Sequence, residues 1–242
     1  MKIIAMIPAR YNASRFPGKL MQHLGSKTVI AHTYLNVLQS GLFDEVAIVT
    51  DSDEIENEIK KYKGKVLRSR KDHECGTDRI AEMCGGFQPE DIIINIQGDE
   101  PFTNTRILDQ LIQFLKDNPA AEVASLKYEI PDTESIRNPN VVKVVCDLQD
   151  RALLFSRAPI PYHRDQERPV HYFKHIGIYG FRQPALLRFA RWPATPLESV
   201  EKQEAMRFLE HGISIYMLTT DEATQGIDTP EDLKEAEKLL RN

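Results

Sequence analysis

Short apolar runs alternate with segments of helical spacing over the first half of the chain. The runs are rich in isoleucine and valine and occupy residues 3–7, 46–50, 65–67, 91–96 and 123–128. Helical segments are indicated at 26–40, 53–62, 77–85 and 107–115. Strands that alternate with helices form parallel sheets covered on both faces. We therefore predict a three-layer α/β/α fold with a mostly parallel, Rossmann-like sheet.

The rhythm of the chain changes after about residue 130. Further strands are indicated at 141–145, 152–155, 173–181 and 213–218, and a polar, charged loop at 162–171. We predict a single domain over 1–242 that contains a smaller mixed α/β lobe at about 130–220.

Helix boundaries in this sequence are marked by capping residues. We expect Asp53 to cap the second helix and Thr77 or Asp78 the third. Leu197, Val200, Met206 and Leu209 predict one apolar helix face over 197–210. Glu201 and Glu204 then share a side of that helix. Thr229 followed by Pro230 is typical of the start of the last helix.

The composition is that of an acidic protein with few cysteines. The chain has 242 residues and a formal net charge of −5, which disfavours a nucleic-acid partner. Three cysteines without a Cys-x-x-Cys pair indicate neither a disulfide framework nor a zinc knuckle. Arg10 and Arg15 interrupt the apolar start, and no run approaches the roughly 18 residues of a membrane span. We expect a cytoplasmic protein without a membrane partner.

A basic loop follows the first predicted strand. We expect that strand to end at Pro8, because proline cannot donate to a sheet ladder. Arg10, Arg15 and Lys19 then lie among small residues, with Pro17-Gly18 near the end. Open α/β sheets bind ligands at the carboxyl ends of their strands. Three cations with free backbone N–H groups suit a triphosphate, and the alternative is a basic surface loop without a ligand.

Two familiar phosphate-binding motifs are excluded by spacing. A Walker A loop needs glycine where Ala13 stands and serine or threonine where Leu20 stands. The Gly-x-Gly-x-x-Gly pattern is also absent, because Gly18 is the only glycine of the loop. A nucleotide site in this chain is therefore of a third kind.

Two aspartates are candidate ligands of a divalent cation. Asp99 follows the strand at 91–96 directly after Gly98, and Asp228 precedes the last helix. Carboxylates at strand ends can hold a cation against phosphates, whereas the alternative role for each is a helix cap or turn.

Other candidate ligand residues lie in a glycine-containing loop and on a later strand. The segment 73–79 offers Gly76 for close approach and Arg79 for an anion or a base. His175 and Tyr179 share one face of their strand and can line one pocket, with Arg157 nearby.

Eight segments together resemble one enzyme family. They are IPARYNASRFPGK (7–19), HECGTDR (73–79), NIQGDEP (95–101), NPNVVKVV (138–145), FSRAPIPY (155–162), KHIGIYGFR (174–182), PLESVEKQEAMR (196–207) and GIDTPEDL (226–233). In order and extent the chain resembles the 3-deoxy-manno-octulosonate cytidylyltransferases, or CMP-Kdo synthetases. The resemblance implies a homodimer that couples CTP with 3-deoxy-manno-octulosonate (Kdo), releases pyrophosphate and supplies CMP-Kdo for lipopolysaccharide biosynthesis.

The resemblance also implies a role for each matching residue. The triphosphate would be held by Arg10, Ser14, Arg15 and Lys19, and the cytidine by Ala9, Gly76 and Arg79. Magnesium (Mg²⁺) would be held by Asp99 and Asp228, which with Arg10 and Lys19 form the catalytic set. The sugar would be met by Gln97, Arg157, His175, Tyr179, Glu201 and Glu204. Transfer of this kind needs positioning and charge neutralisation rather than a covalent intermediate.

One departure from the family pattern bears on the substrate. Many members have glutamine directly after the residue that matches Glu204, and this chain has Ala205. The change could alter recognition of the sugar, so 8-amino-Kdo or another acidic sugar such as a sialic acid is an alternative substrate. A non-catalytic nucleotide sensor is a further alternative, which the joint presence of Lys19, Asp99 and Asp228 disfavours.

Overall fold

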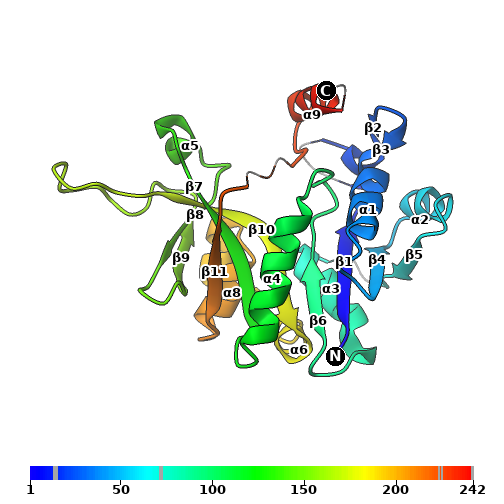
Figure 1. Cartoon of the computed structure of the whole chain (residues 1–242), viewed down its shortest axis with the longest axis horizontal. Coiled ribbons are helices and arrows are strands. Elements are labelled where there is room, and N and C mark those ends of the chain that lie inside the picture. Colours follow the sequence, from blue (N-terminus) through cyan, green and yellow to red (C-terminus); the bar gives the residue numbers. More distant parts are fainter. Residues whose placement is uncertain (13–15, 71–72, 223, 225, 241–242) are drawn as a thin grey trace.

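The predicted strands of both halves of the chain join one mixed sheet. The computed structural model describes residues 1–12, 16–70, 73–222, 224 and 226–240. Within them, the main path of the sheet has the order β11-β7-β10-β6-β1-β4-β5 (Figure 1). Its strands are β1 Ile3–Ala9, β4 Glu45–Thr50, β5 Lys65–Arg68, β6 Ile92–Asn95, β7 Val123–Glu129, β10 Phe173–Arg182 and β11 Ile215–Thr220.

The sheet is mostly parallel, as predicted. Strands β1, β4, β5 and β6 pair in parallel, and β11 pairs in parallel with β7. Only β10 runs against its neighbours on this path, because it is antiparallel to both β6 and β7. Strands β8 Lys143–Cys146 and β9 Ala152–Ser156 extend the sheet from the start of β10, and β2 His23–Leu24 pairs with β3 Lys27–Thr28 separately. The limits of the smaller lobe at about 130–220 stay a prediction.

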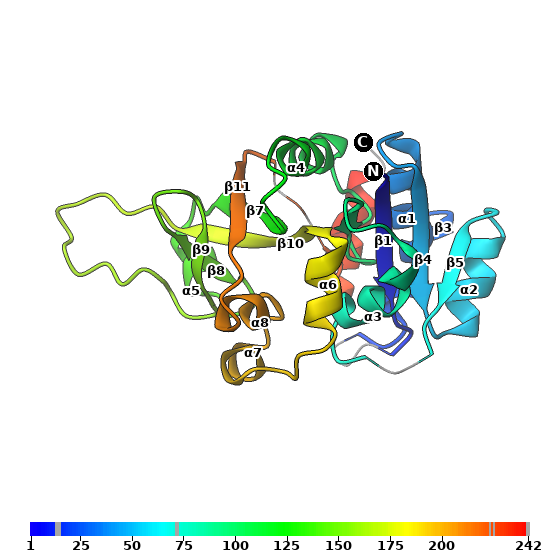
Figure 2. The same ribbon diagram turned by 90° about the horizontal axis from the view of Figure 1, so that it is seen from below.

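Helices cover both faces of the sheet (Figure 2). They are α1 Val29–Gln39, α2 Asp53–Lys60, α3 Gly76–Met83, α4 Thr105–Asp117, α5 Thr133–Arg137, α6 Gln183–Phe189, α7 Pro196–Glu201, α8 Ala205–Glu210 and α9 Pro230–Leu239. Along β1 the side chains alternate between two apolar clusters. Ile7 joins the cluster that contains α1 and α4, whereas Met6 joins the one that contains α3, α6 and α8. The two clusters confirm the three-layer arrangement.

The expectation that the first strand ends at Pro8 is wrong. Strand β1 continues to Ala9, and Pro8 pairs with Val49 of β4. The carbonyl of Met6 accepts from the N–H of Ile96, so the backbone polar groups of residue 6 face β6. Residues two apart in a strand face the same neighbouring strand, so the nitrogen of Pro8 also faces β6. Strand β6 has ended at that level, so proline costs the sheet no hydrogen bond there.

Two of the expected helix caps are displaced by one or more residues. Ser52, rather than Asp53, caps α2, and its hydroxyl accepts from the N–H of Ile55. Cys75, rather than Thr77 or Asp78, caps α3 through its thiol. Thr229 caps α9 as predicted.

The helix predicted over 197–210 is two short helices, α7 and α8. The chain breaks at Lys202, whose φ is +51°. Glu198 and Arg207 would lie about 13.5 Å apart along one straight helix, yet their side chains form an ion pair of 2.6 Å. The chain therefore folds back between them, and Val200, predicted to be an apolar contact, is 81% exposed.

In the ranges given above, no helix is long and apolar enough to cross a membrane.

Candidate functional site

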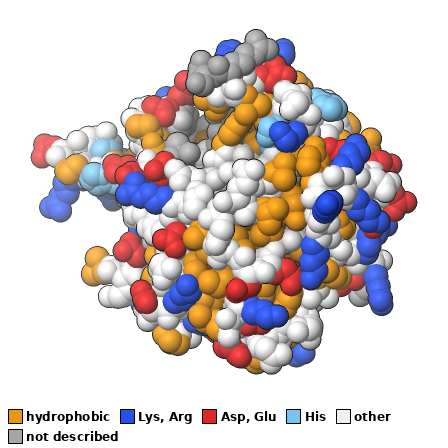
Figure 3. Space-filling model, turned by 45° about the vertical axis from the view of Figure 1, so that its right-hand side comes forward, with side chains coloured by type: hydrophobic (Ala, Val, Ile, Leu, Met, Phe, Trp, Pro, Cys, Tyr) orange, Lys and Arg blue, Asp and Glu red, His pale blue; other side chains and the backbone are white. Residues whose placement is uncertain are grey.

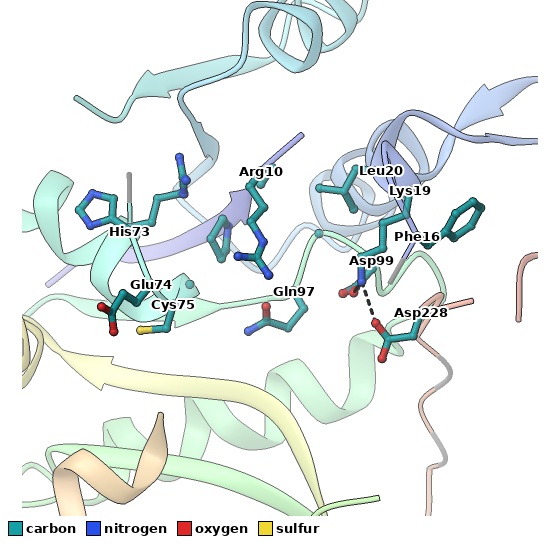
Figure 4. Close-up of a pocket in the computed structure, with 15 residues that line it drawn as sticks. Arg10, Phe16, Lys19, Leu20, His73, Glu74, Cys75, Gln97, Asp99 and Asp228 are labelled. Carbon is teal, nitrogen blue, oxygen red and sulfur yellow. Dashed lines mark hydrogen bonds and ion pairs between the residues drawn. The ribbon is translucent and has the colours of Figure 1, made fainter. Parts of the chain in front are cut away.

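A cavity opens at the carboxyl ends of β1 and β6 (Figure 4). It holds about 210 Å³ and adjoins a larger cleft of about 1160 Å³. Arg10, Gln97 and Asp228 line both, so the two spaces adjoin. We call them the nucleotide-side cavity, lined by Ala9, Arg10, Lys19, Gly76, Arg79, Asp99 and Asp228, and the sugar-side cleft, lined by Arg157, His175, Tyr179, Gln203 and Glu204.

Lys19 lies between the two aspartates predicted as metal ligands. Its Nζ contacts Asp99 Oδ2 and lies 2.8 Å from Asp228 Oδ1 (Figure 4). Burial on its own would lower the pKa of Lys19, but the negative charge of Asp99 and hydrogen bonds to both carboxylates outweigh it, so the pKa is raised. Lys19 is therefore a permanent cation in the wall of the nucleotide-side cavity.

Three local features bring these side chains together. Gly18 has a φ of +66°, which favours glycine, and it precedes the short 3₁₀ helix Lys19–Met21. The N–H of Ile227 donates to the carbonyl of Asp99 at 2.9 Å, which ties the loop before α9 to the loop after β6. Asp228 is then held by the start of α9, because its N–H donates to Asp232 Oδ2 at 3.0 Å.

The donor set fits a hard divalent cation. Mg²⁺ is commonly bound by one or two carboxylates together with substrate phosphates and water. Asp99 and Asp228 supply two carboxylates within reach of one ammonium group. Among the described residues no group of three or more histidine, cysteine or acidic side chains could hold a metal without a substrate.

The remaining predicted nucleotide ligands lie around this cavity. Ala9 ends β1, and the side chain of Arg10 extends toward Gln97 in Figure 4. A Cβ at Gly76 would lie 3.1 Å from Pro8 Cγ, so glycine allows α3 to start close to β1. Ser14 and Arg15 lie outside the described residues.

Arg79 lines the cavity but is already paired with an acid. Its Nη1 lies 2.9 Å from Asp51 Oδ1, directly after β4, and the side chain is 3% exposed. The expected role toward an anion or a base stays a prediction, now with its charge partly neutralised by the protein.

Two aromatic side chains of β10 line the sugar-side cleft. His175 and Tyr179 lie together as predicted, with ring centroids 5.2 Å apart. The sheet register shifts between Ile176 and Tyr179, where residues 176–179 of β10 lie opposite residues 125–126 of β7. The shift is of two residues, so His175 and Tyr179 remain on the same face of the sheet. Burial lowers the pKa of His175 to about 3 and raises that of Tyr179 well above its usual value. Both groups are therefore neutral at ordinary pH.

Arg157 is one of the cationic groups that line the cleft, together with Arg10, Lys174 and Lys202. It donates to the carbonyl oxygens of Glu201 at 2.7 Å and Pro139 at 2.8 Å. Carbonyl acceptors orient a guanidinium group without cancelling its charge, so Arg157 retains its attraction for a carboxylate.

The prediction that Glu201 and Glu204 share one helix side is wrong. Glu201 ends α7 and accepts from Ser156 Oγ at 2.6 Å and the N–H of Arg157 at 2.8 Å. Glu204 lies beyond the break and accepts from the hydroxyl of Thr77 at 2.7 Å and its N–H at 3.2 Å. Burial raises the pKa of Glu204. Both carboxylates tie elements of the protein together.

Sequence reasoning missed Gln203 and Glu100, which also line the cleft. Gln203 contacts His175 and Tyr179, but the assumption of one continuous helix hid its inward position. Glu100 follows Asp99 directly, and this acidic pair was a signal available in the sequence. Burial and the negative charge of Asp99 raise the pKa of Glu100 to about 7, against the opposing charge of Lys174.

Comparison with known proteins returned cytidylyltransferases. A family model described as cytidylyltransferase matches residues 4–215. The chain is 52% identical to a 3-deoxy-manno-octulosonate cytidylyltransferase of Christiangramia forsetii, in an alignment that covers 99% of this chain and 97% of the other protein. A protein of the same name from Flavobacterium johnsoniae is 50% identical, with 100% of each chain covered.

Solved structures give the same result. A CMP:2-keto-3-deoxy-manno-octonic acid synthetase complexed with CTP matches with a TM-score of 0.92 at 38% identity, covering 100% of this chain and 99% of the other. A 4-diphosphocytidyl-2C-methyl-D-erythritol synthase of Anaerococcus prevotii matches with a TM-score of 0.63 at 16% identity, again over 100% and 99% of the chains. That second likeness is one of fold alone.

Proposed function

The chain belongs to the family of 3-deoxy-manno-octulosonate cytidylyltransferases, and we propose that it transfers CMP from CTP to Kdo with release of pyrophosphate. The observation that carries the proposal is that two spaces share part of their lining. A charged cavity at parallel strand ends, which suits a triphosphate, adjoins a polar cleft where Arg157 can bind an acid and His175, Tyr179 and Gln203 can bind hydroxyls.

The chain's own residues supply positioning and charge. Arg10 and Lys19 attract the triphosphate, and Lys19 offsets negative charge that develops on the leaving pyrophosphate. Asp99 and Asp228 would hold Mg²⁺, which when bound draws electron density from phosphate oxygens and the attacking sugar hydroxyl. Arg157 orients the sugar by its carboxylate, so that its anomeric hydroxyl faces the α-phosphorus of CTP.

The two carboxylates considered as partners of an aminated sugar are already bound by the protein. Glu201 and Glu204 each accept two hydrogen bonds from other residues. An ammonium group would have to compete with those bonds, so neither residue gives an aminated sugar an advantage over Kdo.

Pyrophosphate release tests the proposal. The protein is assayed with CTP and Mg²⁺ and with Kdo, 8-amino-Kdo or N-acetylneuraminic acid separately, beside Lys19→Met as the impaired control. We expect release with Kdo at the highest kcat/KM and slower release in the variant. Preference for either other sugar would overturn the substrate, and binding of CTP without any release would favour the nucleotide sensor.

We also propose that the protein is a homodimer. Large apolar side chains are exposed around the β8–β9 hairpin and the arm that follows it, namely Leu148 at 99%, Leu153 at 61% and Tyr162 at 87%. The arm, residues 157–172, extends away from the body and carries charged and histidine side chains (Figure 3). Exposed apolar groups on a projecting element are typical of an interface between protein chains. Light scattering should give the dimer mass, and Leu148→Ser with Leu153→Ser should shift it toward the monomer.

The cytoplasm is the location we propose for this reaction. CTP is a cytoplasmic nucleotide, and the proposed reaction consumes it. Cell fractionation with an antibody to the protein should find it with the cytoplasmic markers; recovery with the membranes would contradict the location.

A further inference from the structure

The amide of Gln203 lies between two aromatic groups of the sugar-side cleft. Its Nε2 is 3.0 Å from His175 Nδ1, and the hydroxyl of Tyr179 lies 3.4 Å from its Oε1. Gln203 is 8% exposed and directly follows the break between α7 and α8. The mechanism derived above gives this buried side chain no role.

The direction of the amide follows from a neighbouring backbone group. The N–H of Ala205 lies 3.5 Å from Oε1 of Gln203. A backbone N–H can only donate, so the amide atom that faces it is the oxygen. The NH₂ group therefore faces His175, and Nδ1 of His175 must accept.

The other nitrogen of His175 gives the same answer independently. Its Nε2 lies 3.0 Å from the hydroxyl of Ser125, which is also 3.1 Å and 2.8 Å from the carbonyls of Ile176 and Ile178. Carbonyls only accept, so the single hydroxyl hydrogen of Ser125 goes to one of them. The oxygen of Ser125 then accepts from Nε2–H. Both ends of the network give a neutral ring with its proton on Nε2.

We propose that Gln203 is a positioning residue for the sugar, which holds His175 in the Nε2–H form and accepts the hydroxyl proton of Tyr179. Two groups then remain for a hydroxyl of the ligand. The ligand hydroxyl can donate to the phenol oxygen of Tyr179 and can accept from the second amide hydrogen of Gln203. The inference rests on the proposed function for the identity of the sugar.

The network also explains how the chain tolerates Ala205. Ala205 is 1% exposed at the start of α8, so its methyl group packs in the interior. Many family members have a glutamine amide at this position, and its absence suggested altered recognition of the sugar. In this chain Gln203, two residues earlier, supplies an amide instead. The cleft therefore keeps an amide donor and acceptor.

Imidazole ¹⁵N NMR of the substrate-free protein tests the tautomer. We expect Nδ1 of His175 to be unprotonated and Nε2 protonated, without change between about pH 5 and pH 8. In Gln203→Glu the carboxylate cannot donate to Nδ1, so a second proton should bind and both nitrogens should be protonated at about pH 7. A proton on Nδ1 in the wild-type protein, or titration near the usual histidine value, would overturn the proposal.

Other charged groups near the ring do not supply this proton. Lys127 on β7 pairs with Asp150 at 2.6 Å, Glu204 is bonded to Thr77, and Arg157 is bonded to backbone carbonyls. The phenol of Tyr179 donates to Gln203 itself. A change of protonation in Gln203→Glu is therefore assigned to residue 203.

Steady-state kinetics provide the second readout. Gln203→Met should raise the KM for Kdo about tenfold. One or two lost hydrogen bonds cost about 1.4 kcal/mol of binding free energy, which corresponds to a factor of ten. The KM for CTP should stay unchanged, because Gln203 lies outside the nucleotide-side cavity. Gln110→Met is the matched control, since Gln110 lies on the surface of α4 and its amide donates to the carbonyl of Thr219.

The two readouts separate failure of this inference from failure of the proposed function. The NMR result needs no substrate, so it can support or overturn the role of Gln203 even if Kdo is not turned over. An equal rise in KM for CTP and Kdo, or an equal effect of Gln110→Met, would overturn the positioning role while Kdo remains the substrate.

Discussion

The nucleotide-side cavity and the sugar-side cleft hold their polar groups in opposite ways. In the cavity, Lys19 faces Asp99 and Asp228 in ion pairs that are partly open to solvent. In the cleft, His175, Tyr179 and Gln203 form a chain of neutral hydrogen bonds. The three residues of the cavity present charge, whereas these three residues of the cleft present donors and acceptors of defined direction.

The difference matches the chemistry of the two proposed substrates. A triphosphate is recognised mainly through charge, and its ligands can exchange an internal ion pair for phosphate or metal. A sugar hydroxyl both donates and accepts, so it is recognised by groups whose hydrogens are already placed. The account therefore predicts that substitutions on the two sides differ in kind.

The largest effect is expected from the aspartates of the nucleotide-side cavity. Asp99→Asn and Asp228→Asn should each lower kcat about a hundredfold to a thousandfold, because each removes a charge that would hold Mg²⁺ against the phosphates. Circular dichroism should show an intact fold. Asp117→Asn, at the exposed end of α4, is the control. Full activity in both active-site variants would remove the metal assignment.

These charged residues are also the ones that sequence reasoning placed well. Lys19, Asp99 and Asp228 stand in loops next to strands and a helix whose positions the apolar pattern predicts. Parallel strands bring such loops to one edge of the sheet, so proximity follows from topology. The three-layer fold could be predicted for the same reason, because each apolar run needs a buried partner.

The sugar-side cleft could be predicted only in part. His175 and Tyr179 share a face of one strand, which the spacing showed. Gln203 and the separate positions of Glu201 and Glu204 depend on the chain break at Lys202. That break is stabilised by the ion pairs of Arg207 with Glu198 and Asp78, which are contacts between distant elements that helical periodicity does not encode.

A stability effect is expected at Glu201, which ties the end of α7 to Ser156 and Arg157. Glu201→Gln replaces two carboxylate oxygens, each of which accepts one hydrogen bond, by an amide with a single acceptor oxygen, so one of the bonds from Ser156 Oγ–H and the N–H of Arg157 is lost. The variant should lose about 2 kcal/mol of unfolding free energy in urea, with an unchanged KM for CTP. Unchanged stability with a higher KM for Kdo would instead make Glu201 a direct sugar ligand.

A smaller, pH-dependent effect is expected at Glu100, which lines the cleft and directly follows Asp99. Its pKa rises from 4.5 to about 7 on folding, so the folded state favours the protonated form. This contribution is present below about pH 4.5 and is lost as the pH rises toward 7. The difference in unfolding free energy between Glu100→Gln and the wild type should therefore shift by about 1–2 kcal/mol in favour of the variant when the pH is raised from about 5 to about 8. Denaturation curves of both proteins without substrate at the two pH values measure this shift. If the difference in unfolding free energy is the same at both pH values, Glu100 is already ionised in the folded state at the lower pH.

The division of labour between cavity and cleft is tested most directly by a two-substrate rate matrix. Pyrophosphate release is measured over a grid of CTP and Kdo concentrations for the wild type, Lys19→Met and Gln203→Met. The account predicts that Lys19→Met lowers kcat and raises the KM for CTP alone, whereas Gln203→Met raises the KM for Kdo alone. A variant that shifts both KM values by the same factor would contradict the assignment of one substrate to each side.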